Sequence, residues 1–247
     1  MKSNINLSLI IVYNNKNKLN KELLDSLQRQ TVIPELILLD SSKYKFQSAS
    51  QALNYGASLA TKDFYVFLHQ DIIFLKKDTL ERLYEYLINN KDSIIGIAGK
   101  KKNDKKIYST IVQGPEKIGF EEGYFKDKVQ VHCLDECLMA CHKNIYLQIK
   151  FDEIVCNNWD FYVCDFCFTA CLKNINIYCV NLDIWHTSLG HPKHSFYKTL
   201  RKLCKKYKGQ LSEIRTCCIY IPNKWYASII VFLKEMRNSL LKIIRER

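Results

Sequence analysis

Glycine and proline are scarce in this chain, with 8 glycines and 4 prolines among 247 residues. This scarcity argues against a low-complexity or linker-rich protein, since such chains are rich in both residues. Long apolar runs are missing as well, and none reaches the roughly 18 residues that a membrane-spanning helix needs. The early apolar stretch at residues 5–13 lacks a small-residue cleavage site, so it is typical of a first buried strand and not of a signal peptide. With 47% hydrophobic residues, the chain can form the core of one α/β domain.

Acidic residues are nearly absent from the C-terminal part of the chain. Residues 193–247 hold 14 Lys and Arg against three Glu and no Asp, a net charge of +11 out of +12 for the whole chain. The remaining 192 residues are therefore close to neutral. An anionic partner, if there is one, should bind the C-terminal region.

Cysteine is plentiful, with 11 residues, but the number is odd. We expect reduced thiols in a cytoplasmic protein, and a peripheral position at the inner face of a membrane is left open. Cys133, Cys137 and Cys141 have helical spacing, and Cys164 and Cys167 form the one C-x-x-C pair. Structural zinc normally needs two such pairs, so this pattern predicts small core residues instead of a zinc site.

The first hundred residues alternate between strand and helix patterns. Strands are predicted at 5–13, 36–39, 64–68 and 94–98, and helices at 17–29, 48–60 and 78–89. The last of these helices begins with Asp78-Thr79-Leu80-Glu81, a capping-box pattern. This order predicts a doubly wound, Rossmann-like and mainly parallel sheet with right-handed crossovers.

The rest of the chain is less regular. Its segments are predicted as loops with a hairpin at 100–128, a strand then a helix at 129–149, a helix from about 159 to 174, and a strand at 175–180. Two basic amphipathic helices should follow. The first has Phe196, Leu200, Leu203 and Tyr207 on one face, and the second, at about 224–245, has Tyr226, Ile229, Leu233, Met236, Leu240 and Ile243 on one face.

We therefore expect a domain at 1–192, with a nucleotide-binding half at about 1–100 and an acceptor half at about 101–192. A basic helical extension at 193–247 would follow it.

Polar side chains follow three of the predicted strands where each strand ends. They are Tyr13-Asn14-Asn15, Asp40-Ser41-Ser42 and His69-Gln70-Asp71. In open α/β sheets, ligands bind outside the carboxyl ends of the strands. An imidazole, an amide and a carboxylate at such an edge can hold a metal ion or a phosphate. Three polar clusters at one edge favour a functional site over ordinary solvated turns.

The sequence resembles the GT-A glycosyltransferases of family 2, and most closely a bacterial branch that carries an HQD motif. The blocks that carry this resemblance are LSLIIVYNN, LILLD, SASQALNYGASLATKDFYVFLHQDI, LDECLMACHKNI, FDE, NWDFYVCDFCFTACLKN and IWHTS. They span roughly residues 5–190 in the order typical of the family. The resemblance implies transfer of a sugar from a nucleotide donor, with a divalent metal and inversion at the anomeric carbon.

The resemblance also implies roles for single residues on the donor side. His69, Gln70 and Asp71 stand in the place of the Asp-x-Asp motif, with Asp71 as a metal ligand and His69 where a carboxylate is usual. His186 would complete the metal site or contact the diphosphate. The residues implied to contact the nucleotide are Tyr13, Asn14, Asp40 and Asn54, although Asp40 could equally cap a turn.

On the acceptor side, the resemblance leaves the catalytic base open. Tyr162 and Val163 fall where the family carries an acidic pair, so Asp160 and Asp165 are both candidates for the base. Asp135 and Glu136 resemble an acceptor-side acidic motif, or could mark the start of a helix. Trp159 could stack on a sugar ring or belong to the core.

The leading hypothesis is a metal-dependent inverting hexosyltransferase. It would use Mn²⁺ or Mg²⁺ and a nucleotide sugar, with UDP as a family-level expectation, and act on a glycan, a lipid-linked acceptor or a cell-surface polysaccharide. The basic helices at 193–247 could lie on an anionic membrane. The alternatives are a nucleic-acid- or membrane-binding protein with a degenerate, inactive fold, and a nucleotidyltransferase. Nucleic-acid binding lacks a recognisable motif, and nucleotidyl transfer lacks a glycine-rich phosphate loop.

Overall fold

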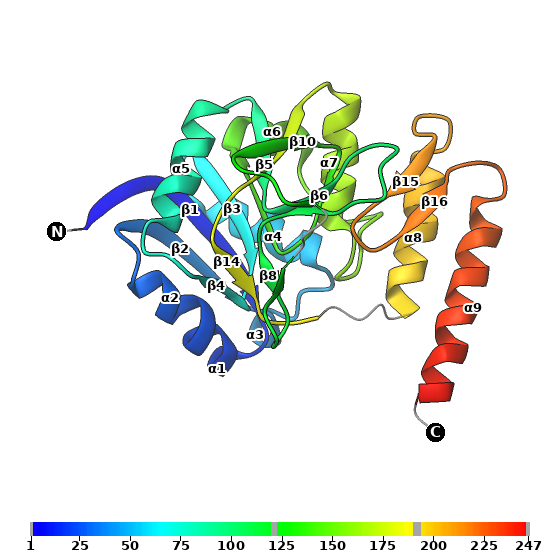
Figure 1. The fold of residues 1–247 in the computed structure, drawn as a ribbon, viewed down its shortest axis with the longest axis horizontal. Coiled ribbons are helices and arrows are strands. Elements are labelled where there is room, and N and C mark those ends of the chain that lie inside the picture. The colour runs from blue at the N-terminus through cyan, green and yellow to red at the C-terminus, as the bar shows by residue number, and fades with distance from the viewer. Residues whose placement is uncertain (1, 120–122, 190–193, 246–247) are drawn as a thin grey trace.

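The computed structural model describes residues 2–119, 123–189 and 194–245 (Figure 1). Its centre is a seven-stranded sheet with the strand order β10-β13-β5-β12-β3-β1-β2. Five of these strands run parallel, namely β1 (Ser3–Tyr13), β2 (Val32–Asp40), β3 (Phe64–His69), β5 (Ser93–Gly96) and β13 (Asn176–Val180). The mixed α/β fold with a mostly parallel sheet agrees with the sequence prediction.

One strand of the central sheet corrects the prediction of a helix within residues 129–149. After β10 (Lys128–Val131), the segment Leu138–His142 forms strand β12, which runs antiparallel between β3 and β5. Helix α6 begins only at Lys143 and ends at Ile149. The residues Leu138–Cys141 are buried on both faces of the sheet, and such an apolar run has no periodicity that separates a strand from a helix.

The cysteines of this region also differ from their predicted helical arrangement. Cys133 lies in β11 (Cys133–Leu134), Cys141 lies in β12, and Cys137 lies between them. All three are buried free thiols. Asp135 and Glu136 consequently lie in the turn between two strands and do not begin a helix.

Helices cover both faces of the central sheet (Figure 1). The core on one face includes α4 (Ala49–Leu59), α6 and α7 (Tyr162–Leu172). The core on the other face includes α1 (Lys16–Leu19), η1 (Asn20–Leu24), α2 (Asp25–Gln28) and α5 (Thr79–Asn89). The helix predicted at 17–29 is thus interrupted by a π-turn.

The start of α5 differs from the predicted capping box. Asp78 makes no capping hydrogen bond with its side chain, and its backbone is not extended, with φ of −101° and ψ of 4°. The amide of Leu80 instead donates to the side-chain oxygen of Gln30, at 3.0 Å. A residue distant in sequence therefore satisfies the helix N-terminus, which no local pattern could reveal.

Two smaller sheets lie beside the central one. The first has the order β4-β14-β8-β9 and contains β4 (Ile72–Phe74), β14 (Ile184–His186), β8 (Val112–Gln113) and β9 (Ile118–Gly119). The second joins β11, β6 (Ala98–Lys100) and β7 (Tyr108–Ser109). The antiparallel pair β8 and β9 forms the hairpin predicted within 100–128.

The C-terminal part contains α8 (His194–Lys206), the pair β15 (Glu213–Arg215) and β16 (Tyr220–Pro222), and α9 (Ala227–Arg245). The predicted stripe of α8 is buried in the same core as α7. The predicted boundary between residues 192 and 193 lies outside the described residues. No helix in the described part of the chain is long and apolar enough to cross a membrane.

The predicted apolar face of the last helix does not pack on the domain. Ala227 and Val231 face inward and are buried, whereas Ile229, Leu233 and Met236 are about half exposed. The physical reason is that α9 packs on the core through Ala227, Ile230 and Val231, and an ion pair between Glu235 and Arg201 of α8 holds this side of the helix inward. The side chain of Ile243, predicted on the same face, lies outside the description.

Candidate metal and nucleotide site

A cavity of about 470 Å³ opens at the carboxyl ends of β1 and β3. The two strands are neighbours, with Val12 paired to His69, so the residues that follow them meet at one edge of the sheet. The cavity is lined by Val12, Tyr13, Asn14, Ser41, His69, Gln70, Asp71, Trp159, Asp160 and Ser195. Seven of the residues selected from the sequence therefore line a single cavity.

Three potential metal ligands gather beside this cavity. His69 ends β3, Asp71 lies in the turn after it, and His186 ends β14 opposite Ile72 of β4. One ligand atom from each residue lies within 4.8 Å of the others, and this is the single such group found among the described residues. The pairing of β4 with β14 thus brings residues from the two halves of the chain together.

The two oxygens of Asp71 have different partners. Oδ1 faces the imidazoles, at 3.4 Å from Nε2 of His186 and 3.9 Å from Nδ1 of His69. Oδ2 accepts from Nζ of Lys18 at 3.1 Å and from Oγ of Ser188 at 2.5 Å. Burial alone would raise the pKa of Asp71, but the contacts with His186, His69 and Ser188 hold that pKa well below its ordinary value. Asp71 is therefore a negatively charged residue in the lining of the cavity.

The imidazole ring of His69 has a partner at each nitrogen. Its Nε2 lies 3.0 Å from the hydroxyl of Tyr162, and its Nδ1 faces Asp71. Burial, followed by the nearby His186, lowers the pKa of His69 and so favours the neutral imidazole. A metal-ligating histidine usually binds the ion through one ring nitrogen while the other is hydrogen-bonded, and the Tyr162 hydroxyl holds Nε2 of His69 in this way while Nδ1 faces Asp71.

Gln70 joins the first and third strands. Its Oε1 accepts from the amides of Asn14 and Asn15 at 3.1 and 3.0 Å, and its Nε2 donates to Oδ1 of Asn14 at 2.8 Å. These bonds fix the loop after β1 against the loop after β3. Gln70 thereby shapes the cavity as well as lining it.

Asp40 caps a short helix at the same sheet edge. Its Oδ1 accepts from the amide and hydroxyl of Ser42 at 3.0 and 2.5 Å, which caps α3 (Ser41–Tyr44). Those bonds, led by the Ser42 hydroxyl, lower the pKa of Asp40. Asp40 is paired with Tyr13 in the strand register, and burial together with Asp40 raises the pKa of Tyr13. Asp40 itself is outside the cavity lining.

Asn54 lies away from the cavity, and its side chain has a full set of partners. Nδ2 donates to the carbonyl of Phe151 at 2.9 Å and to Oε1 of Glu153 at 2.8 Å. Oδ1 accepts from the hydroxyl of Tyr146 at 2.8 Å and from the amide of Phe151 at 3.1 Å. In this geometry, Asn54 links α4 to the chain after α6 and does not contact a nucleotide in the cavity.

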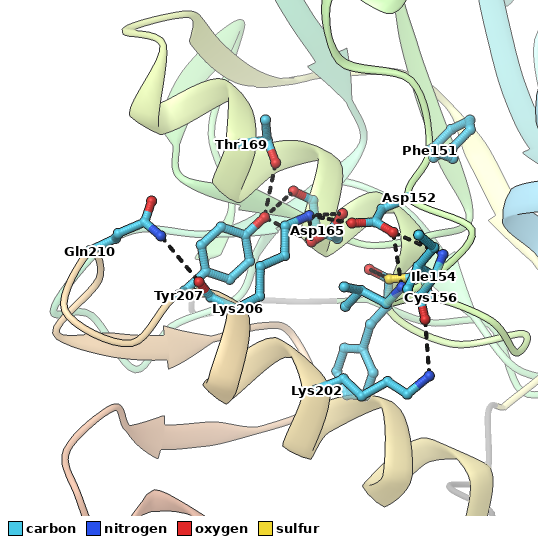
Figure 2. A network of polar contacts seen from close by, with 12 residues as sticks. Phe151, Asp152, Ile154, Cys156, Asp165, Thr169, Lys202, Lys206, Tyr207 and Gln210 are labelled. Carbon is cyan, nitrogen blue, oxygen red and sulfur yellow. Dashed lines mark hydrogen bonds and ion pairs between the residues drawn. The ribbon is translucent and has the colours of Figure 1, made fainter.

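The two candidate bases lie in different environments. Asp160 lines the cavity, and its Oδ2 accepts from Oγ of Ser195 at 3.2 Å. Asp165 lies within α7 and is 2% exposed. Figure 2 shows Asp165 in a buried network with Lys206 and Tyr207, whose side chains donate to it at 2.7 to 2.9 Å. The structure therefore brings Asp160, and not Asp165, to the candidate site.

The network around Asp165 places one ammonium group, that of Lys206, between the carboxylates of Asp165 and Asp152. Burial raises the pKa of the Asp165 carboxyl, and the bonds from Lys206 and Tyr207 oppose that rise. Burial lowers the pKa of Lys206, but its contacts with Asp165 and Asp152 more than offset this, so the pKa is raised. These groups hold α8 against α7 and the loop before it.

Asp135 and Glu136 lie outside the main cavity. They border a separate small cavity of about 30 Å³ together with Phe161, Cys164, Phe196, Thr216, Cys217 and Cys218. Oδ1 of Asp135 accepts from the amide of Cys137 at 3.1 Å, and Oε1 of Glu136 has no hydrogen-bond partner in the part of the chain that the structure describes. Burial, followed by Asp135 and Asp160, raises the pKa of Glu136 well above its ordinary value.

Several residues of the site had no assigned role in the sequence analysis. They are Lys18, Ser41, Tyr162, Ser188 and Ser195. Ser188 follows His186 by two residues, and its Oγ lies 3.4 Å from Nε2 of His186, so a continued strand period would have placed both on one side. Lys18 carries no such signal, because its contact with Asp71 joins positions 53 residues apart.

A family described as a glycosyltransferase-like family matches residues 8–207. The chain belongs to this family. The match spans both halves of the cavity, from β1 through α8. No curated protein matches the chain at a significant level.

Two solved structures show that this family member has a GT-A-like fold. One is GalNAc-T7 with UDP, GalNAc and Mn²⁺, which is 12% identical with a TM-score of 0.57 over 76% of this chain and 45% of the other. The second is residues 1–349 of TarS from S. aureus in complex with UDP-GlcNAc, 14% identical with a TM-score of 0.54 over 83% and 66%. The chain thus spans about half to two thirds of the length of these proteins.

Proposed function

We propose that the protein is a metal-dependent, inverting hexosyltransferase that uses a UDP-sugar and modifies a glycan, a lipid-linked acceptor or a cell-surface polysaccharide. The observation that carries the proposal is the group His69, Asp71 and His186, which lies beside a cavity lined by Tyr13, Gln70 and Trp159. The family membership and the UDP and Mn²⁺ of the structural neighbours support it.

The residues present fit a divalent metal ion. Two imidazoles and one carboxylate converge within 4.8 Å, a donor set that accepts Mn²⁺ and other transition metals more readily than Mg²⁺. Oδ1 of Asp71 is the oxygen that faces both imidazoles, since Oδ2 is engaged by Lys18 and Ser188. We infer that His69, Asp71 and His186 hold the metal. When bound, the metal would neutralise charge on the leaving diphosphate.

On the donor side, the loop after β1 would hold the nucleoside. Tyr13 and Ser41 at the start of α3 both line the cavity, and the Ser41 hydroxyl donates to the carbonyl of Tyr13 at 3.1 Å. Gln70 keeps the loop in place through Asn14. Lys18, whose ammonium group is partly exposed beside Asp71, would bind a donor phosphate oxygen and so complement the metal.

On the acceptor side, we propose Asp160 as the general base. Its carboxylate would take the proton from the acceptor hydroxyl while that oxygen forms a bond to the anomeric carbon. The bond from the anomeric carbon to the diphosphate oxygen breaks at the same time, and its electron pair leaves with the diphosphate. Attack opposite the leaving group inverts the anomeric carbon. Trp159, which is 47% exposed in the same cavity, would stack on the acceptor ring.

A donor screen tests this proposal. The protein is incubated with a panel of UDP-, GDP- and CMP-activated sugars, with Mn²⁺, with Mg²⁺ or with a chelator, and release of the nucleotide is measured. We expect release from a UDP-sugar that requires the divalent ion. Asp71→Asn should lower the rate at least about a hundredfold.

The matched control is Asp25→Asn, which removes an exposed carboxylate from an ion pair on α2. Its rate should equal that of the original protein. Release that ignores the chelator and is unchanged in Asp71→Asn would refute the proposal. Metal-dependent donor binding without any turnover would instead favour an inactive glycosyltransferase fold.

A further inference from the structure

Helix α9 carries a broad apolar face that no described part of the chain covers. In Figure 1, α9 lies outside α8, at the edge of the molecule farthest from the central sheet. At 100° per residue, positions 229, 233, 236 and 240 fall on one side of a helix, opposite the buried Ala227 and Val231. The large apolar side chains that are at least 41% exposed on α9 are Ile229, Phe232, Leu233, Met236, Leu240 and Leu241.

A cationic groove lies between α8 and the start of α9, and the residues of α9 that line it are Ala227 and Ser228. It has a volume of about 340 Å³ and is lined by residues of α8 and of the chain around the start of α9, with Arg201, Lys202, Lys205, Lys208 and Lys224 as its charged residues. None of the described residues that line it is acidic. Trp225, which is 80% exposed, stands at the same groove.

Most of this positive charge is not neutralised within the protein. Arg201 pairs with Glu235, and Lys202 donates to the carbonyl of Ile154 and to Asn157. Among the described residues, Lys205, Lys208 and Lys224 are in no ion pair. Three ammonium groups are therefore available to an external anion.

We propose that α9 and the cationic groove dock on the surface of an anionic lipid bilayer, with the apolar face of α9 among the acyl chains near the headgroups. An exposed apolar face, flanking lysines and an interfacial tryptophan together match the requirements of such a surface. A second copy of the chain is disfavoured as the occupant, because a symmetric pairing would bring two groups of unpaired lysines together. Nucleic acid would leave the apolar face uncovered. This inference does not depend on the sugar-transfer reaction.

Flotation of the full chain with vesicles tests the docking surface. One set of vesicles contains phosphatidylcholine alone, and the other contains added phosphatidylglycerol. We expect binding to the anionic vesicles that weakens as salt is raised, and little binding to the neutral ones. Replacing Lys205, Lys208 and Lys224 together by Gln should lower the partition coefficient about a hundredfold.

A second triple variant tests the apolar face, with Leu233, Met236 and Leu240 each changed to Gln. These side chains are exposed, so the fold and thermal unfolding should be unchanged while vesicle binding falls at least about tenfold. The matched control changes two exposed apolar residues elsewhere, Leu59→Gln and Leu147→Gln, and should bind like the original protein.

Equal binding to neutral and anionic vesicles, or no binding to either, would overturn the proposal. So would a vesicle-free dimer, detected by light scattering, that the Leu233, Met236 and Leu240 triple variant abolishes, since a second copy would then be the occupant. Salt-sensitive binding to a nucleic acid with no binding to lipid would assign the groove to that partner instead.

Discussion

Asp160 and Asp165 lie close together in the sequence, on either side of the start of α7, yet they belong to two different regions of the molecule. Asp160 lines the cavity at the carboxyl ends of β1 and β3, beside Trp159 and Ser195. Asp165 is buried in the core between α7 and α8. There Lys206 donates to both carboxylate oxygens of Asp165, and the Tyr207 hydroxyl donates to its Oδ1 (Figure 2).

The comparison distinguishes a carboxylate that can contact a substrate from a carboxylate that stabilises the fold. A general base must reach a substrate, and a carboxylate that lines a cavity can do so. A carboxylate that is buried and paired with an ammonium group instead fixes two helices, and its removal leaves an unpaired charge. We therefore expect a substitution of Asp160 to lower the reaction rate and a substitution of Asp165 to lower the stability of the fold.

The largest predicted effect is on catalysis. Asp160→Asn should lower kcat by about 10² to 10⁴ because it removes the proposed base, while the thermal unfolding midpoint stays nearly constant. Steady-state rates of donor turnover and a melting curve check both parts. Asp165→Asn is the matched variant and should show the reverse pattern. A normal rate in Asp160→Asn would contradict the proposal that Asp160 is the base.

The second prediction concerns the stability of the Asp165 network. Lys206→Met should lower the free energy of unfolding by about 3 to 5 kcal/mol, because Asp165 would keep a buried charge without its partner. Denaturant unfolding measures this change. The double variant with Asp165→Asn should recover part of the loss, since the unpaired charge is then gone. A loss in the double variant that equals the sum of the two single-variant losses would show that the pair is not coupled.

The smallest predicted effect is on the free energy of unfolding, and it tests whether Asn54 belongs to the core or to the cavity. Asn54→Ala should lower the free energy of unfolding by about 1 to 3 kcal/mol, because the Phe151 amide and the Tyr146 hydroxyl lose a shared acceptor. Its affinity for UDP should not change. Gln70→Ala should weaken UDP binding instead, and titration calorimetry distinguishes the two. Weakened UDP binding in Asn54→Ala would contradict the assignment of Asn54 to the structural region.

The sequence alone predicted the parallel part of the sheet and the edge at which polar residues meet. Strands β1, β2 and β3 alternate with helices, and parallel strands bring their carboxyl ends together, so Asn14 and His69 could be expected at one cavity. Strand β12 was missed because an apolar run that is buried on both sides has no diagnostic period. The contact between Lys18 and Asp71 was missed because long-range packing creates it.

The outward face of α9 is a second feature that the sequence could not predict in full. The sequence period predicts an apolar face on α9, but periodicity gives only the direction of a face and not the medium that it meets. Glu235 and Arg201 pair across the inner side and turn the apolar side chains outward. Whether a stripe packs on its own domain depends on the neighbouring helix as much as on the stripe.

The central claim is that His69, Asp71 and His186 hold a metal ion that takes part in nucleotide binding. Titration calorimetry of UDP, with Mn²⁺ and then with a chelator, tests it on the original protein, on His186→Ala and on Asp165→Asn. We predict tight binding of UDP only with Mn²⁺, a loss of about tenfold or more in His186→Ala, and unchanged affinity in folded Asp165→Asn. UDP affinity that is the same with and without Mn²⁺, or that is unaffected by His186→Ala, would contradict it.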